Sequence, residues 1–377
     1  RHNRLEQSTK QTALFAQVNH YFNEKLSVSL GGRYVKSTKE ADQRVTLASI
    51  SHVDDPAMGE IRDFSWAVGQ PPGSFFSPDY FMSYQIISPG ATPHAFENMQ
   101  RKEEHTMLQS SIRYQTNNAM MYYATWANGA KVGGFDLMYE GAMGQALPED
   151  VEFEDEQANT IEIGFKRDWS SVRFNLAAFY GQYKDLQVSV FTGSVGFNVG
   201  NAAKSTQQGV DAELIWQLSD NLSFSSNIEY LDNTYEDFEN AACSFSEDPR
   251  GINNGFCDWE NKTMPWVPKL KAVIVAEYQS QLSSNYLFIQ LLSISYKSKH
   301  TTSSDNDSAT IQSGYSLVNY RAQLSSTENN WSLALSVSNV FDKYFELFTG
   351  NIPLNNGAYG HGLHKGREIT LVASYQF

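Results

Sequence analysis

Residues 222–230 read Leu-Ser-Phe-Ser-Ser-Asn-Ile-Glu-Tyr, and they set the pattern of the whole chain. From Leu222 to Tyr230 the apolar residues fall on even positions, while the odd positions hold Ser, Asn or Glu. A period of two is typical of a β-strand whose two faces meet different surroundings. Residues 218–221, just before this stretch, read Leu-Ser-Asp-Asn and have the composition of a tight turn.

The same alternation recurs on both sides of this stretch. It predicts thirteen strands, near residues 11–22, 26–38, 105–115, 119–128, 158–167, 172–191, 204–217, 222–234, 270–280, 286–298, 314–324, 331–342 and 366–377. The connections between them alternate between short turns and long loops, the longest being 39–104. Residues 286–298 are apolar on both faces, so the sequence leaves the register of that strand open. Loop 39–104 has room for further strand-like pieces.

This alternation of connections favours a transmembrane antiparallel β-barrel, an all-β fold with tight periplasmic turns and long extracellular loops. Aromatic residues on the apolar face support it, because they form two belts roughly 20 Å apart, close to the apolar band of such barrels. The belt beside the short turns holds Phe22, Tyr114, Phe165, Trp216, Tyr278, Tyr286, Trp331 and Phe377, and the other holds Tyr34, Trp126, Tyr180, Tyr230, Tyr296 and Phe341. A soluble propeller or solenoid fits less well, since neither requires strongly unequal loops.

Composition agrees with this interpretation. Apolar residues make up 41% of the 377 residues, yet no uninterrupted run approaches the ~18 to 20 that a membrane helix needs. The formal charge of −14 argues against nucleic acid as a partner. We find no composition shift or linker, so the sequence predicts that residues 1–377 belong to one barrel domain.

An odd number of strands cannot close an antiparallel barrel, and single-chain bacterial barrels have even counts. Either one strand is hidden, or the N-terminal part of the barrel is absent from this chain. The first residue, Arg1, is not Met and no charged-then-apolar leader follows it. We therefore expect this chain to be a fragment of a longer protein.

Several segments resemble the C-terminal part of the barrel of TonB-dependent outer-membrane receptors. They are Asn339-Val340-Phe341-Asp342-Lys343-Tyr344, the final strand 367–377, Gly129-Ala130-Lys131-Val132-Gly133-Gly134-Phe135, Tyr183-Lys184-Asp185-Leu186-Gln187-Val188, and Asn201 followed by Gly209-Val210-Asp211-Ala212-Glu213. The resemblance covers essentially the whole chain. It implies about 13 strands of a 22-stranded barrel, with the N-terminal plug, the TonB box and the first strands absent.

The resemblance also implies a function. Such receptors lie in the outer membrane of Gram-negative bacteria and take up a scarce, bulky nutrient, most often a ferric siderophore or other iron complex. The implied partners are the TonB-ExbB-ExbD energy-coupling complex, acting through the missing plug, a small-molecule ligand, outer-membrane lipid and lipopolysaccharide. The alternatives are a passive porin and a surface receptor or adhesin that does not transport. A nucleophile with a nearby base is not evident, so we expect no enzyme, no catalytic residue and no cofactor.

The candidate ligand-binding residues are aromatic and lie in loop 39–104. We select Trp66, Tyr80 and Tyr84, whose rings can stack on a ligand, although such rings also pack loops against themselves. Cys243 and Cys257 flank thirteen residues rich in Gly, Asn and Asp, which favours a loop-closing disulfide over two free thiols.

Three other motifs have both a functional and a plainer interpretation. The final strand has an apolar face that ends on an aromatic C-terminus, similar to the signal read by the barrel-assembly machinery, and its signal residues are Ile369, Leu371, Tyr375 and Phe377. Six carboxylates within 149–156 suit a solvated loop better than a Ca²⁺ site. His361 and His364 lack a third ligand, so we predict no metal site.

Overall fold

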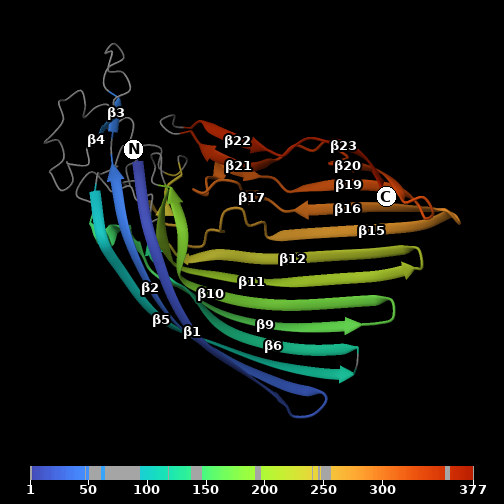
Figure 1. Ribbon diagram of the computed structural model, residues 1–377, viewed down its shortest axis with the longest axis horizontal. Coiled ribbons are helices and arrows are strands. Elements are labelled where there is room, and N and C mark those ends of the chain that lie inside the picture. The colour runs from blue at the N-terminus through green and yellow to red at the C-terminus, as the bar shows by residue number, and fades with distance from the viewer. Residues whose placement is uncertain are drawn as a thin grey trace.

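A computed structural model of the chain describes residues 2–46, 48–50, 61–63, 94–117, 119–136, 147–191, 197–239, 241–244, 247, 256–352 and 357–376. Thirteen strands form one large curved sheet in which each strand pairs with its neighbours in antiparallel fashion (Figure 1). The order in the sheet follows the chain: β1 (His2–Tyr21), β2 (Leu26–Thr46), β5 (His94–Asn117), β6 (Met120–Lys131), β9 (Glu156–Asp168), β10 (Val172–Phe191), β11 (Phe197–Ser219), β12 (Leu222–Asp237), β15 (Leu270–Ser283), β16 (Tyr286–Lys297), β19 (Tyr315–Ser326), β20 (Trp331–Ser338) and β23 (Glu368–Tyr375). The thirteen predicted strands are confirmed.

Several strands run further toward the long loops than the alternation predicts. β1 and β2 stay paired up to His2 and Thr46, and β5 starts at His94 rather than near residue 105. These extensions are rich in Lys, Glu, Gln and Thr on both faces, so they carry no apolar period. Ladder hydrogen bonds continue where the hydropathy pattern stops. Residues 39–46 and 94–104, which the sequence predicts as the two ends of loop 39–104, are therefore strand.

Short hairpins occupy the ends of the long connections, at the end of the sheet opposite the tight turns (Figure 1). They pair β3 (Ala48–Ile50) with β4 (Ile61–Asp63), β7 (Gly134–Phe135) with β8 (Glu152–Phe153), β13 (Ala241–Ala242) with β14 (Phe256–Cys257), β17 (His300–Thr301) with β18 (Ile311–Gln312), and β21 (Glu346–Asn351) with β22 (Tyr359–Leu363). The turns have the expected local chemistry. In the first of them, Asn23 Oδ1 accepts the N–H groups of Lys25 and Leu26 at 2.8 and 2.9 Å.

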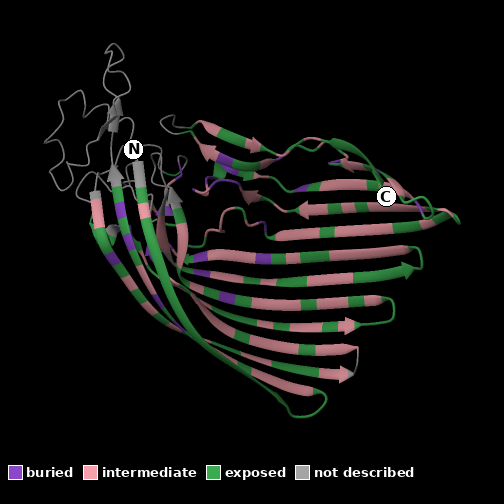
Figure 2. Ribbon diagram, in the orientation of Figure 1, coloured by how far each residue is buried: buried purple, intermediate pink, exposed green. Residues whose placement is uncertain are grey.

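The two faces of the sheet differ as predicted, and the large buried clusters lie outside the middle of the sheet. Apolar side chains of both belts are exposed on one face, for example Tyr230 at 49% and Trp216 at 42%. Neighbouring belt residues touch across strands, with the rings of Tyr286 and Trp331 6.0 Å apart. Buried residues gather mainly toward the loop end (Figure 2). This arrangement suits a sheet that meets lipid on its apolar face.

The register of β16, which the sequence leaves open, is fixed by its neighbours. Leu292 lies opposite Ala276 of β15 and Tyr320 of β19, so the even positions of β16 share the apolar face. Gln290 is the polar exception on that face, and its Oε1 accepts the hydroxyl of Tyr320 at 2.7 Å. This bond gives a polar side chain a partner on a face that lacks water.

Close contact between neighbouring strands explains why position 209 of β11 holds a glycine. A Cβ atom there would lie 2.2 Å from the carbonyl oxygen of Tyr230 and 2.7 Å from the ring of Phe179, which lies across the glycine. We expect Gly209→Val to cost about 1 to 3 kcal/mol and to slow barrel assembly, because backbone and ring must both move. Heat-modifiable gel mobility of the full-length protein measures this. Gly129→Val is the matched control, because a Cβ there meets nothing within 4 Å; equal loss of the folded band in both variants would contradict the explanation.

Candidate functional site

β5 and β6 separate before either strand ends. Their pairing ends at Gln109 and Ala127, beyond which β5 continues with β2 and β6 continues with β9. The side chain of Asn128 joins β6 to β5 just beyond their last backbone pair. Its Oδ1 accepts the N–H of Leu108 at 2.6 Å, and its Nδ2 donates to the carbonyl of Thr106 at 3.2 Å. Because β6 no longer pairs with β5 toward the loop end, the segment that follows β6 can turn onto the polar face of the sheet.

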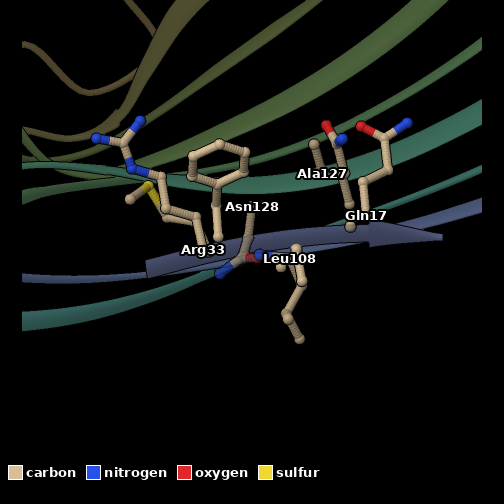
Figure 3. Close-up of a pocket in the computed structure, with 11 residues that line it drawn as sticks. Gln17, Arg33, Leu108, Ala127 and Asn128 are labelled. Carbon is tan, nitrogen blue, oxygen red and sulfur yellow. The ribbon is translucent and has the colours of Figure 1, made fainter. Parts of the chain in front are cut away.

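A cavity of about 360 Å³ lies at the same place (Figure 3). Gln17 and Arg33 rise on one side of the strands with Ala127, and Leu108 points to the other side. The cavity is lined by Phe15, Ala16, Gln17, Gly31, Gly32, Arg33, Met107, Leu108, Gln109, Ala127 and Asn128. One guanidinium and several amides suit a ligand group that is anionic or accepts hydrogen bonds.

Arg101 is the centre of a cluster of charges above this cavity, which we call the Arg101 cluster: Arg101, Glu103, Glu152 and Glu154. Its guanidinium lies 2.5 Å from Glu103 and from Glu154, and 3.4 Å from Glu152. The side chains of Arg101 and Glu103 are only 11% and 9% exposed. Burial lowers the pKa of Arg101, but hydrogen bonds with Glu154 and Glu103 outweigh it and raise that pKa. Arg101 therefore stays charged, and its sheltered pair with Glu103 forms an anchor.

The anchor holds the segment that follows β6. Glu103 also accepts the N–H of Gly133 at 3.1 and 3.2 Å, and Lys39 Nζ donates to the carbonyl of Gly133. Burial lowers the pKa of Lys39, whose side chain is partly covered there. One apolar cluster supports these contacts, made of Ala41, Met99, Phe135 and Val151. Residues 132–136 and 147–156 are thus fixed to β2 and β5.

Segments that carry the family resemblance meet at this anchor. The Nε2 of Gln187 donates to the carbonyls of Val132 and Glu154 at 3.1 and 3.0 Å. Asn201 Nδ2 donates to the carbonyls of Asp185 and Glu154 at 2.6 and 3.1 Å. The motif near residues 129–135, the motif near 183–188 and Asn201 are far apart in sequence, and the structure gives them one shared role.

Sequence reasoning missed Arg101, and it also underestimated the acidic run. Glu152 and Glu154 contact Arg101, while Glu156 Oε2 accepts the N–H of Gln187 at 3.0 Å. Asp155 Oδ2 also accepts the Nε2 of Gln157 at 3.2 Å. At least four of the six carboxylates therefore have partners within the protein, so the run is more than a solvated loop. Arg101 and Glu103 are two residues apart and so share one face of a strand. This spacing could have indicated a charge pair, but the sequence did not show which other residues contact it.

A second unit lies beyond β12 and contains both cysteines. Cys243 and Cys257 form a disulfide with Cα atoms 5.0 Å apart. Beside it, Tyr235, Phe238, Ala241 and Trp259 form a buried cluster. Burial raises the pKa of Tyr235 to about 12. The hairpin β13–β14 thus has a small core of its own outside the membrane-spanning part of the sheet.

A third unit joins hairpin β21–β22 to the segment between β17 and β18. Asp305 and Asp307 are buried, and they accept hydrogen bonds from Asn351 Nδ2 at 2.5 Å and from the hydroxyl of Tyr359 at 2.8 Å. Thr349 N–H donates to the carbonyl of Thr302 at 2.8 Å. These bonds fix one face of the hairpin.

Tyr359 allows a test of this third unit by pH. Burial, followed by its bond to Asp307, raises the pKa of Tyr359 to about 12 from 10.0. A raised pKa means that its contribution to stability is complete below about pH 10 and is lost as pH rises through about 12. We expect Tyr359→Phe to remove one phenolate absorbance transition near pH 12. Loss of a transition near pH 10 instead would show that the hydroxyl is not held by Asp307.

Only some of the predicted site residues lie within the described part of the chain. Trp66, Tyr80 and Tyr84 lie outside the described residues, as does Phe377. Ile369, Leu371 and Tyr375 are exposed on the apolar face of β23, between 62% and 68%. His361 Nδ1 lies 3.0 Å from Glu346, whereas the ring of His364 stacks on Phe345, so the two histidines have separate partners.

Within the ranges that the structure describes, His, Cys, Asp and Glu side chains do not gather in threes that could hold a metal ion. In the same ranges, no helix has the length and apolar character needed to cross a membrane.

Residues 3–340 match the family described as TonB dependent receptor-like, beta-barrel. The fold is similar to the ferric yersiniabactin uptake receptor FyuA from Yersinia pestis, with 14% identity, a TM-score of 0.71, and coverage of 100% of this chain and 47% of that chain. The siderophore receptor PiuA from Acinetobacter baumannii gives 17% identity, a TM-score of 0.65, and coverage of 98% and 43%.

The Ferric-Catecholate import receptor Fiu from K12 E. coli is also similar, with 13% identity, a TM-score of 0.65, and coverage of 99% of this chain and 45% of that chain. The chain therefore spans about half the length of these solved receptors. At such low identity the likeness concerns the fold alone. A search of curated protein sequences found no match.

Proposed function

The chain belongs to the family of TonB-dependent receptor-like β-barrels, and from this membership we propose that the complete protein is an outer-membrane receptor that takes up a scarce, bulky nutrient. Energy would come from the TonB-ExbB-ExbD complex through a plug domain, and the host would be a Gram-negative bacterium. Residues 1–377 would form a single barrel domain that supplies thirteen strands of a 22-stranded barrel.

One observation carries this proposal. An apolar, aromatic-belted face lies behind a polar face, and the segment that follows β6 is anchored on the polar face by Arg101. A membrane wall with a polar interior suits passage of a polar cargo, and an outer segment fixed to that wall suits a defined entrance. A soluble sandwich would have its polar face toward solvent and its apolar face in a core.

The proposed substrate is a ferric siderophore or another iron complex. Support comes from the names of three similar receptors, which describe ferric yersiniabactin uptake, a siderophore receptor and ferric-catecholate import. The cavity beside Arg33 adds hydrogen-bonding groups on the polar face that suit such a cargo. Trp66, Tyr80 and Tyr84 remain proposed ligand contacts in the long loop.

Two further partners belong to the proposal. The exposed apolar residues Ile369, Leu371 and Tyr375, with Phe377, would present β23 to the barrel-assembly machinery. The apolar face would contact outer-membrane lipid and lipopolysaccharide. For β23 the proposal is tested by Tyr375→Lys, which should lower the amount of assembled full-length receptor without lowering its synthesis.

Uptake of radioactive iron by cells tests the function. Cells that carry the full-length gene should accumulate iron from a siderophore complex, and deletion of either this gene or the gene for TonB should abolish that accumulation. Accumulation that persists without TonB would indicate a passive porin. Binding without accumulation in cells that contain TonB would indicate a surface receptor or adhesin.

A further inference from the structure

Two lysines lie side by side on the outward face of the sheet, just beyond the aromatic belt on the loop side. Lys184 of β10 lies four positions beyond the belt residue Tyr180 and therefore shares its outward face. It lies directly opposite Lys204 of β11, and both side chains are exposed. Four positions of a tilted strand rise ~10 Å, so the two ammonium groups lie just above the apolar band. We call Lys184 and Lys204 the lysine pair.

The lysine pair has no acidic partner in the part of the chain that the structure describes. Asp237 of β12 lies opposite Lys204 at a register shift, but the two side chains form no ion pair there. Lys184 likewise forms none within the described ranges. Like charges that lie directly opposite each other on neighbouring strands destabilise a sheet. The pair therefore has a cost that an anion from outside this chain would offset.

Two other lysines of the sheet show the usual arrangement. On the same outward face, Lys36 lies 2.7 Å from Glu104. On the interior face Lys271 and Lys297 also lie opposite each other, and there Glu229 lies 2.5 Å from Lys271. The formal charge of the chain is −14, so acidic residues are not scarce. The lysine pair is thus distinguished by its free positive charge at the height where the apolar band ends.

A cavity of about 230 Å³ lies beside the lysine pair. Gln157 of β9 lies directly opposite Lys184 and lines this cavity, which extends to the place where β5 and β6 separate. Asn159 lines it from the next outward position of β9, and within the described chain its amide has no partner. The hydroxyl-bearing Thr106 lines the other side. Amides and hydroxyls both donate and accept hydrogen bonds, as the hydroxyl groups of a sugar require.

We propose that the lysine pair and the cavity beside it bind the phosphorylated sugars of lipid A, the membrane anchor of lipopolysaccharide. The inference rests on the proposed outer-membrane location and names the group that this part of the outward face binds. Lysine ammonium groups just above the apolar band suit a phosphate. The neighbouring amides suit the sugar hydroxyls next to that phosphate. A phospholipid headgroup would engage the lysines but leave the amides without a ligand.

Binding of lipids to the purified full-length protein in detergent tests this site. The probes are lipid A with both phosphates, the same lipid A after removal of its phosphates, and phosphatidylglycerol, which has a phosphate but no sugar. We compare the wild type with the double variant Lys184→Gln, Lys204→Gln and with Asn159→Ala. The matched control is Lys166→Gln, Lys297→Gln, which removes the same charge from two exposed lysines of the interior face.

The double variant of the lysine pair should bind phosphorylated lipid A about tenfold or more weakly than the wild type, and the control variant should match the wild type. Asn159→Ala should weaken binding of lipid A and leave binding of phosphatidylglycerol unchanged. Equal binding by the double variant and the wild type, or equal binding of lipid A with and without phosphates, would overturn the proposal. Phosphatidylglycerol that binds as tightly as lipid A would overturn the assignment to lipid A.

Iron uptake by cells separates this inference from the receptor function. Uptake that depends on TonB, together with equal lipid binding by all variants, would overturn the lipid A site and leave the receptor standing. Lipid A binding that depends on the lysine pair, without uptake, would support the site and contradict the proposed transport.

Discussion

Replacement of Arg101 by Met is expected to release residues 132–136 and 147–156 from the wall at a cost of about 3 to 5 kcal/mol, because it leaves a buried carboxylate without its cation. Glu103 is 9% exposed and would keep the N–H of Gly133 as its hydrogen-bond donor, with His105 Nε2 4.0 Å away. Glu154 is 67% exposed, so the loss of its contact should add little. The large effect comes from the sheltered pair.

Hydrogen exchange of the full-length protein measures this release, through faster exchange at Gly133 and at Asp136, whose N–H donates to the carbonyl of Val151. Lys102→Met is the matched control, because Lys102 is exposed on the opposite face of the same strand. A second substitution, Glu103→Gln, should restore part of the protection in the Arg101→Met background by removing the unpaired charge. Equal exchange in the Arg101 and Lys102 variants would contradict the role given to the cluster.

Replacement of Cys243 and Cys257 by Ser is expected to loosen hairpin β13–β14 by about 3 kcal/mol, the value for a closed loop of this size. The two cysteines are separated by 14 positions, and the cluster of Tyr235, Phe238 and Trp259 lies directly beside the bridge. Without the bridge this small cluster must hold the hairpin alone. Protease cleavage within 240–256 should become much faster, while the main sheet stays resistant.

A thiol assay provides the control for this prediction. In unfolded, unreduced wild-type protein neither cysteine should react with a maleimide, and both should react after reduction. Reaction before reduction would show that the bridge is absent from the isolated protein. If the bridge is present but cleavage of the double variant is unchanged, the aromatic cluster holds the hairpin without help.

Local alternation was enough to predict the sheet, because the order of apolar and polar residues within a strand shows which residues share each face. Leu222 to Tyr230 carries its face assignment in the sequence, and all thirteen strands were found in this way. β16 is the instructive exception. Leu291 and Leu292 are both apolar, and only pairing with Ala276 and Tyr320 decides which of them faces outward. The register of β16 depends on its neighbouring strands, so it cannot be predicted from the sequence of β16 alone.

The candidate site was harder to predict, because its contacts join residues that lie far apart in the chain. Arg101 meets Glu154 across 53 positions, and Gln187 meets Val132 across 55. Charged residues in long loops usually face solvent, so the acidic run gave no sign of its partner. The family motifs pointed to this region, and they did so without naming Arg101.

Spin labels placed singly along β12 of the full-length protein in lipid vesicles test the central claim, that one face of this sheet meets lipid and the other lines a polar interior. Labels at Phe224, Ser226 and Ile228 should be relaxed mainly by oxygen dissolved in lipid, and labels at Ser225 and Asn227 mainly by a water-soluble nickel complex. This period of two along the strand is the expected result. Equal access of both agents at odd and even positions, or no access of lipid oxygen at any of them, would contradict it.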